Sequence, residues 1–514
     1  LKSSRSAQGH RLLDLLSPSA WYGMMAASRW ELALLDAALR ASCRQGGRAR
    51  PRSQAMLYTS AISECRRERR WGTAVELLRQ MFVGELGVDV VAVNATISAC
   101  GRGAQWPTAI GLLSWMRVAC LAPDVISFNS TISACEKSGR WEVAVGIFAG
   151  MPGQAAAPDA ITYSALISAC ERGHQWHRAV LCMSEMQHRR VAGDVVTYSA
   201  AISSCGKASR WGDALDYWRE MRQDRVRPNV VAYSAALSAC EKGQQWAQAM
   251  RLLEDMQNDR AKHDVISYSA AISACEKGRQ WAQAISLLQR MECDAVAPNV
   301  ITYNATISAC EKGWHWPIAL RLFGSMRAGS LAPDLVSFNA TIGACAQARS
   351  VGPALDLFAA LASEGLRPDR VTYNVVLDAA SDVPGGREIF QQALHEGIFP
   401  GLVSSGVCLL DTHDLSPGAA RWAVRWWLDE VIPGALGRLP EGSPPPPPFQ
   451  VIVGRQRSRK AWSSSGESVH DAVISVLNEL GVRWEAGSNE GRVRLLAPPT
   501  LASCPEPRRL GQKK

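Results

Sequence analysis

The 514-residue chain lacks the features that mark several broad classes of protein. It has no apolar run long enough to cross a bilayer, so we expect no membrane-spanning segment and no membrane partner. It has no CxxC pair, which would indicate a zinc site. Charged residues make up only 20% of the chain and hydrophobic residues 47%, which excludes wholesale disorder. The net charge of +9 is a weak indication of a polyanionic partner.

The dominant feature of the sequence is a repeat of 35 residues. Nine units follow one another without insertion from residue 55 to residue 369, and a tenth, shorter unit runs from 370 to about 401. Residues 1–54 form an N-terminal segment with a degenerate repeat, because Arg29, Trp30 and Ala33 match the second half of a unit. The predicted array therefore occupies residues 55–401.

Each unit has the pattern of a helix hairpin. Two segments with apolar residues at helical spacing flank a glycine-containing turn. In six units a proline stands next to last and stops the second helix, and the Asp or Asn that ends the unit is suited to cap the next helix. Alanine at unit position 20, from Ala74 to Ala354, indicates close contact between helices.

Cysteine and tryptophan also recur at fixed positions of the unit. Position 11 holds nine of the fifteen cysteines, which we interpret as buried, reduced core residues of a protein in a reducing compartment. These are Cys65, Cys100, Cys135, Cys170, Cys205, Cys240, Cys275, Cys310 and Cys345. Position 17 is tryptophan in the first eight units, either as a ladder for base stacking or as part of the hairpin core, and its place beside the position-20 alanine favours the core.

The segments VVTYSAAIS, VISYSAAIS and VITYNATIS, in units that end in PD, PN or a variant, resemble the pentatricopeptide repeat family in its P-type, 35-residue form. The resemblance covers about two thirds of the chain. It implies an all-α, right-handed superhelical solenoid of helix-turn-helix repeats whose first helices line a groove for single-stranded RNA.

Position 5 of each unit is always a short polar residue, which is a poor choice inside a helix. Such residues favour helix caps, but a cap alone would be satisfied by one residue type, so we favour a row of groups that face base edges. Position 35 alternates between Asp and Asn, which exchanges a pure acceptor for a group that also donates.

In the family that the repeats resemble, positions 5 and 35 of one repeat together select one base. The residues implied here are Thr59 with Asp89, Asn94 with Asp124, Asn129 with Asp159, Ser164 with Asp194, Ser199 with Asn229, Ser234 with Asp264, Ser269 with Asn299, Asn304 with Asp334, Asn339 with Asp369, and Asn374 in the short unit. Thr or Ser with Asp favours G, Ser with Asn favours A, and Asn with Asp favours U. The nine full units then predict the site 5′-GUUGAGAUU-3′.

Two further positions fit the same groove. Position 2 is branched and aliphatic from Val91 to Val336, and the resemblance implies that these side chains separate neighbouring bases. Position 13 is basic in eight units, which predicts a stripe of phosphate contacts, although solvated surface is the alternative. The basic residues are Arg67, Arg102, Lys137, Arg172, Lys207, Lys242, Lys277 and Lys312.

From about residue 406 the repeat stops, and alternating segments predict a small α/β domain over residues 402–497, followed by a basic tail at 498–514. We expect strands at 406–411, 449–454, 482–486 and 492–497, and helices that begin at Ser416 with Pro417 and near residue 467. A proline-rich, extended loop is expected at about 432–448.

This domain resembles the small MutS-related (Smr) domain. Leu410, Asp411, His413, Leu415 and Ser416 match its Leu-Asp-Leu-His-Gly-Leu-Ser motif, while the second motif, Thr-Gly-x-Gly, is degraded at residues 453–456. Because some members nick nucleic acids, the resemblance implies a catalytic role for Asp411 and His413. The alternative is that this pair only orders the following helix. The phosphate-binding residues implied here are Arg455, Arg457, Arg459 and Lys460.

The sequence as a whole predicts a monomeric RNA-binding protein of mitochondria or plastids (chloroplasts) that serves RNA processing, stabilisation or translation alongside other RNA-processing proteins. A site-specific endoribonuclease and a helical protein scaffold are the alternatives. We expect no cofactor and no small-molecule substrate, with a divalent metal only if the terminal domain is a nuclease. The basic segment at residues 1–13 is interpreted as the remnant of a transit peptide or as a loose end.

Overall fold

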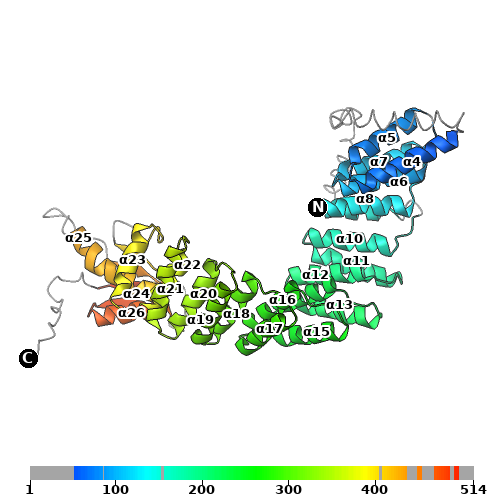
Figure 1. The fold of residues 1–514 in the computed structure, drawn as a ribbon. Helices are drawn as coiled ribbons and strands as arrows, with labels where there is room; N and C mark the ends of the chain where they lie inside the picture. Colours follow the sequence, from blue (N-terminus) through cyan, green and yellow to red (C-terminus); the bar gives the residue numbers. More distant parts are fainter. Residues whose placement is uncertain are drawn as a thin grey trace, which may run out of the picture. The chain divides into compact units, whose positions relative to one another are not determined.

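The computed structural model of the chain describes residues 51–84, 86–151, 156–404, 408–436, 449–453, 468–486 and 491–496. Helix hairpins follow one another along the chain, as predicted (Figure 1). They form two compact units. The first comprises the chain up to Gly243 together with Ala247–Lys262, and the second comprises Gln244–Trp246 together with the chain from His263 onward. Among the described residues, no helix combines the length and the apolar character that a membrane span requires.

The first helix of a hairpin begins at position 1 of its repeat, except in the first full repeat, where it begins four residues earlier. These helices are α4 (Pro51–Arg67), α6 (Val90–Arg102), α8 (Val125–Lys137), α10 (Ala160–Arg172), α12 (Val195–Lys207), α14 (Val230–Lys242), α16 (Val265–Lys277), α18 (Val300–Lys312), α20 (Leu335–Gln347) and α22 (Arg370–Ala379).

The second helices pack against the first and in most repeats begin at the position-17 tryptophan. They are α5 (Trp71–Val83), α7 (Trp106–Val118), α9 (Trp141–Gly150), α11 (Trp176–His188), α13 (Trp211–Gln223), α15 (Trp246–Asn258), α17 (Trp281–Cys293), α19 (Trp316–Ala328), α21 (Val351–Ser363) and α23 (Gly385–His395).

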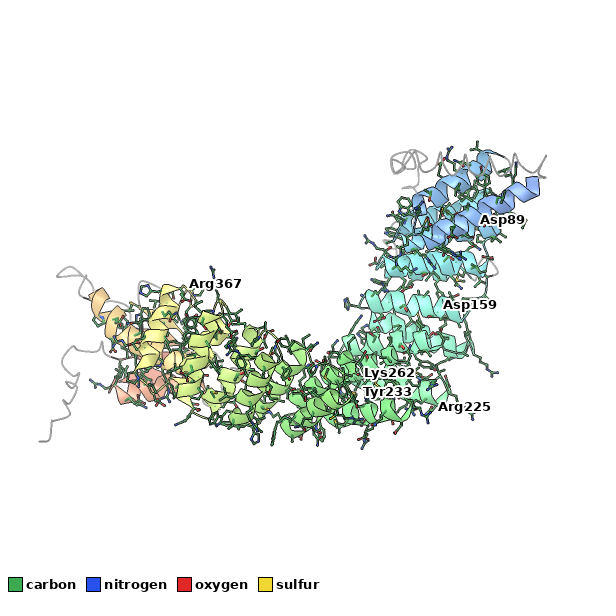
Figure 2. All side chains as sticks on the ribbon, in the orientation of Figure 1. Asp89, Asp159, Arg225, Tyr233, Lys262 and Arg367 are labelled. Carbon is green, nitrogen blue, oxygen red and sulfur yellow. The ribbon has the colours of Figure 1, made fainter. Side chains whose placement is uncertain are left out.

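The residue that ends each full repeat caps the next first helix, as the sequence predicts. Asp89, for example, accepts a hydrogen bond from the Ala92 backbone N–H, and Asp159 accepts one from Thr162 (Figure 2 labels both aspartates). The same bond is made by Asp124, Asp194, Asn229, Asp264, Asn299, Asp334 and Asp369. Each cap satisfies one of the N–H groups that a helix start leaves without an intrahelical partner.

Small side chains allow the two helices of each hairpin to approach closely. Every position-20 alanine from Ala74 to Ala354 is fully buried, and the position-11 cysteines are buried free thiols. Burial raises the pKa of the Cys135 and Cys240 thiols to about 12, so these groups are neutral and unreactive at physiological pH. The interpretation of these cysteines as core residues is confirmed.

The interpretation of the position-17 tryptophans as hairpin core is confirmed only in part: Trp316, for example, packs against a buried cluster that contains Ala319. The tryptophans are only partly buried, and Trp211 is 37% exposed. The ring of Trp141 also covers Gly173, which ends the first helix of the following repeat, so closely that a Cβ built on Gly173 would lie 2.2 Å from the Trp141 ring. Trp71, Trp211, Trp246 and Trp281 cover Gly103, Gly243, Gly278 and Gly313 in the same way.

In two of the repeats without this glycine, a cation covers the preceding tryptophan instead. Ala208 replaces it in the repeat that follows Trp176, and the Arg210 guanidinium lies 4.7 Å from the Trp176 ring centroid. Arg140 covers Trp106 at 5.5 Å. The tryptophan therefore packs on the following repeat, and we call this contact the tryptophan clamp. The glycine provides space for the ring rather than backbone freedom, since Gly173 has an ordinary φ of −81°.

The carboxy-terminal region is a five-stranded sheet with helices. Its strands are β1 (Val403–Ser404), β2 (Leu409–Asp411), β3 (Gln450–Ile452), β4 (Trp484–Ala486) and β5 (Arg492–Leu495), in the order β1-β2-β3-β5-β4. Among the strand pairs of the described residues, only that of β2 with β3 is parallel. Helix α24 (Pro417–Trp426) begins at Pro417 with Ser416 as its cap, continues through a π-helical turn, η2 (Trp427–Val431), and packs against α26 (Val469–Glu479).

The four expected strands and both helix starts are confirmed, while β1 was missed because only two of its residues pair. The loop expected from about residue 432 was wrong at its beginning, where Ile432–Leu436 forms helix α25. Burial of Ile432 against the sheet domain extends the preceding helical segment into these residues. The proline run itself lies outside the described residues, as do the degenerate repeat in residues 1–50 and the basic tail.

The last hairpin and the sheet domain share one hydrophobic core. Tyr373 and Leu377 of α22 and Phe390 of α23 belong to the same buried cluster as Leu410 of β2 and Trp427. The terminal domain therefore covers the end of the array, which would otherwise expose the apolar face of its last hairpin.

The tryptophan clamp makes a prediction about stability. Gly173→Ala should lower the free energy of unfolding by about 1 to 3 kcal/mol, because the added Cβ would overlap the Trp141 ring. Thermal and urea unfolding would measure the change. Gly146→Ala in α9 is the matched control, because no atom lies within 4 Å of its Cβ position, and it should stabilise by about 0.5 to 1 kcal/mol. Equal effects of the two substitutions would contradict the clamp.

Candidate nucleic-acid interface

The first helices present a row of exposed aliphatic side chains at position 2. Their exposure lies between 54% and 64%, which is high for Val and Ile. The residues are Val91, Ile126, Ile161, Val196, Val231, Ile266, Ile301 and Val336. Exposed aliphatic groups that recur at one position of eight successive repeats suggest a contact surface for an apolar partner such as a base face.

Positions 2, 5, 9 and 13 of neighbouring repeats line one hollow. Between α12 and α14 this hollow has a volume of about 480 Å³. Its lining includes Val196, Ser199, Ser203 and Lys207 from α12 and Val231, Ser234, Ser238 and Lys242 from α14. The residues that the sequence assigned to base and phosphate contacts are thus brought together on one face of these two repeats.

Asparagine at position 5 is bonded to the aspartate that ends its own repeat. The Asn94 Nδ2 donates to Asp124 Oδ1 at 3.0 Å, and Asn129 makes the same bond to Asp159 at 3.0 Å. Asn304 reaches Asp334 at 2.9 Å, whereas Asn339 reaches Asp369 only at 3.4 Å. The two positions expected to act as a pair are therefore in direct contact in these four repeats.

The paired aspartates are held ionised. Burial alone would raise the pKa of Asp124, but hydrogen bonds from the Ser127 backbone and hydroxyl and from Asn94 outweigh it, and the pKa is lowered. The pKa values of Asp159 and Asp334 are lowered by the same balance. All three carboxylates are acceptors at neutral pH, and each accepts the asparagine amide through its Oδ1.

The shorter residues at position 5 do not reach position 35. Thr59 and Ser199 donate to backbone carbonyls four residues earlier, at 3.0 and 2.6 Å. The buried Ser234 hydroxyl has no hydrogen-bond partner in the described part of the chain. Ser164 is 9% exposed, and Ser269 contacts the hydroxyl of Thr302 at 3.1 Å. Position 35 of these repeats thus lacks the contact that the asparagines supply.

Asn374, in the short repeat, is placed differently from the other position-5 residues. It is 1% exposed, its side-chain oxygen accepts from the Ser416 backbone N–H at 3.2 Å, and its carbonyl accepts from the Ser416 hydroxyl at 3.0 Å. The terminal domain therefore occupies the space in which a base would meet Asn374, and we leave this residue out of the interface.

Several basic residues at position 13 are paired with acids. Lys207 contacts Glu171 at 3.0 Å, and Lys312 contacts Glu276 at 2.6 Å. The two glutamates stand at position 12 of the preceding repeat, as does Glu136, which contacts Arg172 at 3.5 Å. The sequence reasoning missed these glutamates, although Glu directly precedes the basic residue in five units. They offset the positive charge of three of the eight basic residues of the stripe, namely Arg172, Lys207 and Lys312.

Glu311 occupies the same position but has lost its usual partners. In the equivalent contact, Glu276 accepts from the Ser308 hydroxyl at 3.1 Å and pairs with Lys312. In the repeat that follows Glu311, these two positions are Gly343 and Gln347, and a Glu311 carboxylate oxygen lies 2.6 Å from the Cβ position of Gly343. Burial without these partners raises the pKa of Glu311 to about 7.

In the terminal domain, Asp411 and His413 are brought together at the end of β2. The His413 Nδ1 lies 2.6 Å from Asp411 Oδ1, and its Nε2 lies 3.3 Å from Asp414 Oδ2. Arg370, the first residue of α22, contacts Asp414 at 2.7 Å and ties this loop to the last repeat. No group of three His, Cys, Asp or Glu residues suited to a metal ion occurs in the described ranges. Arg455, Arg457, Arg459 and Lys460 lie outside those ranges.

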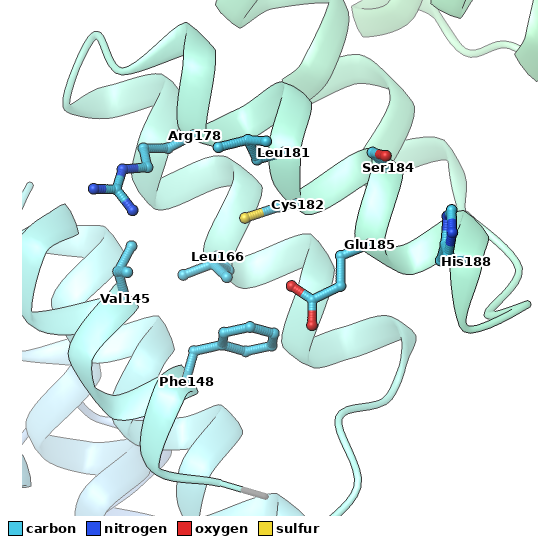
Figure 3. A pocket seen from close by; sticks show the side chains of 9 residues that line it. All are labelled: Val145, Phe148, Leu166, Arg178, Leu181, Cys182, Ser184, Glu185 and His188. Atoms are coloured by element: carbon cyan, nitrogen blue, oxygen red, sulfur yellow. The ribbon is translucent and has the colours of Figure 1, made fainter.

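A second hollow, of about 500 Å³, lies over the second helices rather than the first. It is lined by Val145 and Phe148 of α9, Leu166 of α10, and Cys182 and Glu185 among the residues of α11 (Figure 3). It contains none of the side chains at positions 2, 5, 13 or 35. We do not assign it to the interface.

Family models identify the repeats. A pentatricopeptide repeat domain model matches residues 251–312, and a PPR repeat family model matches residues 123–172, 158–207, 193–242, 298–347 and 333–382. The matched segments, which together span residues 123–242 and 251–382, are pentatricopeptide repeats. No curated protein matches the chain.

Solved structures similar to the pentatricopeptide array include PPR10 from maize, with 23% identity and a TM-score of 0.47 over 82% of this chain and 58% of that one. This chain therefore spans less than two thirds of the maize protein. Yeast Rmd9p, solved with a 16-nucleotide target RNA, has 10% identity and a TM-score of 0.34 over 76% of this chain and 88% of that one. The PPR domain of Arabidopsis thaliana PRORP1, solved with tRNA, has 12% identity and a TM-score of 0.32 over 35% and 95%.

The environment of Glu311 predicts a pH-dependent stability. A raised pKa means that the folded chain binds this proton more tightly than the unfolded chain, so the free energy of unfolding falls as the pH rises from about 4.5 to about 7. Glu311→Gln should therefore raise the melting temperature at pH 8 and leave it nearly unchanged at pH 5. Glu276→Gln, the matched control, loses contacts to Lys312 and Ser308 and should not stabilise at either pH. An equal gain for Glu311→Gln at both pH values would contradict this account.

Proposed function

We propose that the array binds single-stranded RNA and reads one base with each repeat. The carrying observation is the row of exposed position-2 aliphatics beside the bonded pairs at positions 5 and 35. An exposed branched side chain packs on the flat face of a base, while the amide and carboxylate beside it meet the polar edge. A groove that binds a protein helix would not need a bonded amide and carboxylate in several repeats.

The pairs give a candidate RNA sequence. The nine full repeats correspond to 5′-GUUGAGAUU-3′, with U assigned to the four repeats that contain an Asn–Asp pair. Because Asn374 is covered by the terminal domain, we propose that reading ends with the ninth repeat. We further propose that the protein is a P-type member with an Smr-like terminal domain that acts on organellar transcripts in processing, stabilisation or translation.

We propose that phosphate contacts contribute less to the RNA affinity than eight unpaired basic residues would contribute. Glu136, Glu171 and Glu276 already pair with Arg172, Lys207 and Lys312. Each phosphate neutralised by a protein cation adds roughly 0.9 to the salt slope of binding in duplex DNA and about 0.7 in single strands. Cations that must first leave a carboxylate gain less from a phosphate, so base contacts carry a larger share of the affinity.

Selection of RNA from a random pool tests this function. We expect the enriched sequences to contain a run related to GUUGAGAUU, with U best defined opposite the Asn–Asp repeats. The double substitution Asn94→Ser with Asp124→Asn should shift the preference at the second nucleotide from U to A, while the other positions stay the same. An enriched pool unrelated to this run would overturn the assignment, and failure to retain any RNA would favour a protein-binding scaffold.

Endonucleolytic cleavage is a second candidate function, because the Asp411 carboxylate holds the His413 ring at 2.6 Å, as a general base would require. Cleavage of the selected RNA with Mg²⁺ or Mn²⁺ would be followed on gels for the wild type, His413→Ala and His470→Ala. His470 is the control, since it lies beside Asp471 in the same domain. We expect only His413→Ala to lose activity, and cleavage that survives it would remove His413 from the chemistry.

A further inference from the structure

A buried hydroxyl of the following repeat completes the contact between Asn94 and Asp124. The Ser127 Oγ lies 2.6 Å from Asn94 Oδ1 and 2.8 Å from Asp124 Oδ1, and we assign its one hydrogen to the nearer, amide oxygen. The same Oγ accepts from the Asp124 backbone N–H at 3.2 Å. The Ser127 backbone N–H in turn donates to Asp124 Oδ1 at 2.8 Å. Three side chains from two repeats therefore form a closed ring of hydrogen bonds, in which Ser127 is fully buried.

The same ring occurs twice more. Thr162 donates to Asn129 Oδ1 at 2.6 Å, and Ser337 donates to Asn304 Oδ1 at 2.5 Å. Both hydroxyl residues are fully buried and stand at position 3 of the repeat that follows the asparagine. Thr372 occupies the same position after Asn339 but bonds only Asp369, and there the Asn339 oxygen is left without a partner.

Position 3 holds a hydroxyl residue in most repeats, and it is alanine only where position 5 of the preceding repeat is not asparagine. Each of the four asparagines in the full repeats is followed by a Ser or Thr at position 3 of the next repeat. The two alanines at position 3, Ala92 and Ala232, follow Thr59 and Ser199, whose hydroxyls donate to backbone carbonyls instead. The three other serines at position 5 are followed by Thr197, Ser267 and Thr302. Asp89 and Asn229 cap their helices onto alanine, so the cap bond itself does not require the hydroxyl.

The ring fixes the orientation of the asparagine amide. Asp124 accepts from the amide nitrogen and Ser127 donates to the amide oxygen, so the inverted orientation would place two acceptors against each other. One N–H of the amide and one lone pair of its oxygen stay outside the ring. A base edge that meets this amide therefore finds its donor and its acceptor in fixed places.

We propose that Ser127, Thr162 and Ser337 are positioning residues that set the base preference of the preceding repeat, without touching the base. The inference rests on the proposed RNA function and extends it from two residues per base to three for the Asn repeats. A hydrogen bond of this kind contributes about 0.5 to 1.5 kcal/mol, which corresponds to a two- to tenfold change in discrimination.

The experiment compares the full chain with Ser127→Ala on 5′-GUUGAGAUU-3′ and on the same RNA with C at the second nucleotide. The ratio of the two Kd values should fall two- to tenfold in Ser127→Ala and stay near that of the wild type in Ser127→Thr. The ratio of Kd values for RNAs that differ at the ninth nucleotide should stay the same in both variants. Ser337→Ala, tested at the eighth nucleotide, repeats the measurement in an independent repeat if Ser127→Ala folds poorly by circular dichroism.

Ser267→Ala is the matched control. Ser267 stands at the same position and its repeat is capped in the same way, but its hydroxyl donates to the Asp264 carbonyl at 2.9 Å rather than to a position-5 side chain. It should leave the discrimination at the sixth nucleotide unchanged. If Ser127→Ala weakens all RNAs equally and keeps the ratio, the positioning role is overturned while base reading stands. A wild type without preference at the second nucleotide would overturn both proposals.

Discussion

The side chain that ends each repeat is the constraint on which the rest of this structure depends. Asp124 caps α8 through the Ser127 N–H, and the same carboxylate oxygen receives the amide of Asn94. One atom thus starts a helix in one repeat and orients a polar side chain in the previous repeat. Because folding needs the cap, the groove receives an ordered row of carboxylates and amides that no ligand has to organise.

Much of the array could be predicted because its signals are periodic. Position-20 alanines and position-11 cysteines are buried wherever they recur, since a residue repeated in phase meets the same neighbours in every repeat. The contacts of the position-17 tryptophans were predicted only in part, for a related reason. Periodicity shows that Trp141 has a constant environment, but it does not show whether the partner is its own hairpin or Gly173 of the next one.

Contacts between repeats are the part that the sequence did not reveal. The pairing of Glu276 with Lys312 and the donation of Ser337 to Asn304 join residues 36 and 33 positions apart, across two helices. In the sequence, such contacts are visible only as covariation between repeats. The repeat that follows Glu311 has Gly343 and Gln347 at the positions where other repeats have serine and lysine, and the pKa of Glu311 is raised there. For the same reason the burial of Asn374 could not be foreseen, because Ser416 belongs to an element outside the repeat.

The end of the array shows how packing limits a repeated function. The short repeat keeps the Asn at position 5, yet its hairpin must bury the apolar face that a further repeat would have covered. The sheet domain provides that cover through Trp427 and Leu410, and Ser416 then takes the hydrogen bonds of Asn374. Stability at the end of the solenoid and access to the last polar residue exclude each other, since one surface cannot contact both the terminal domain and a ligand.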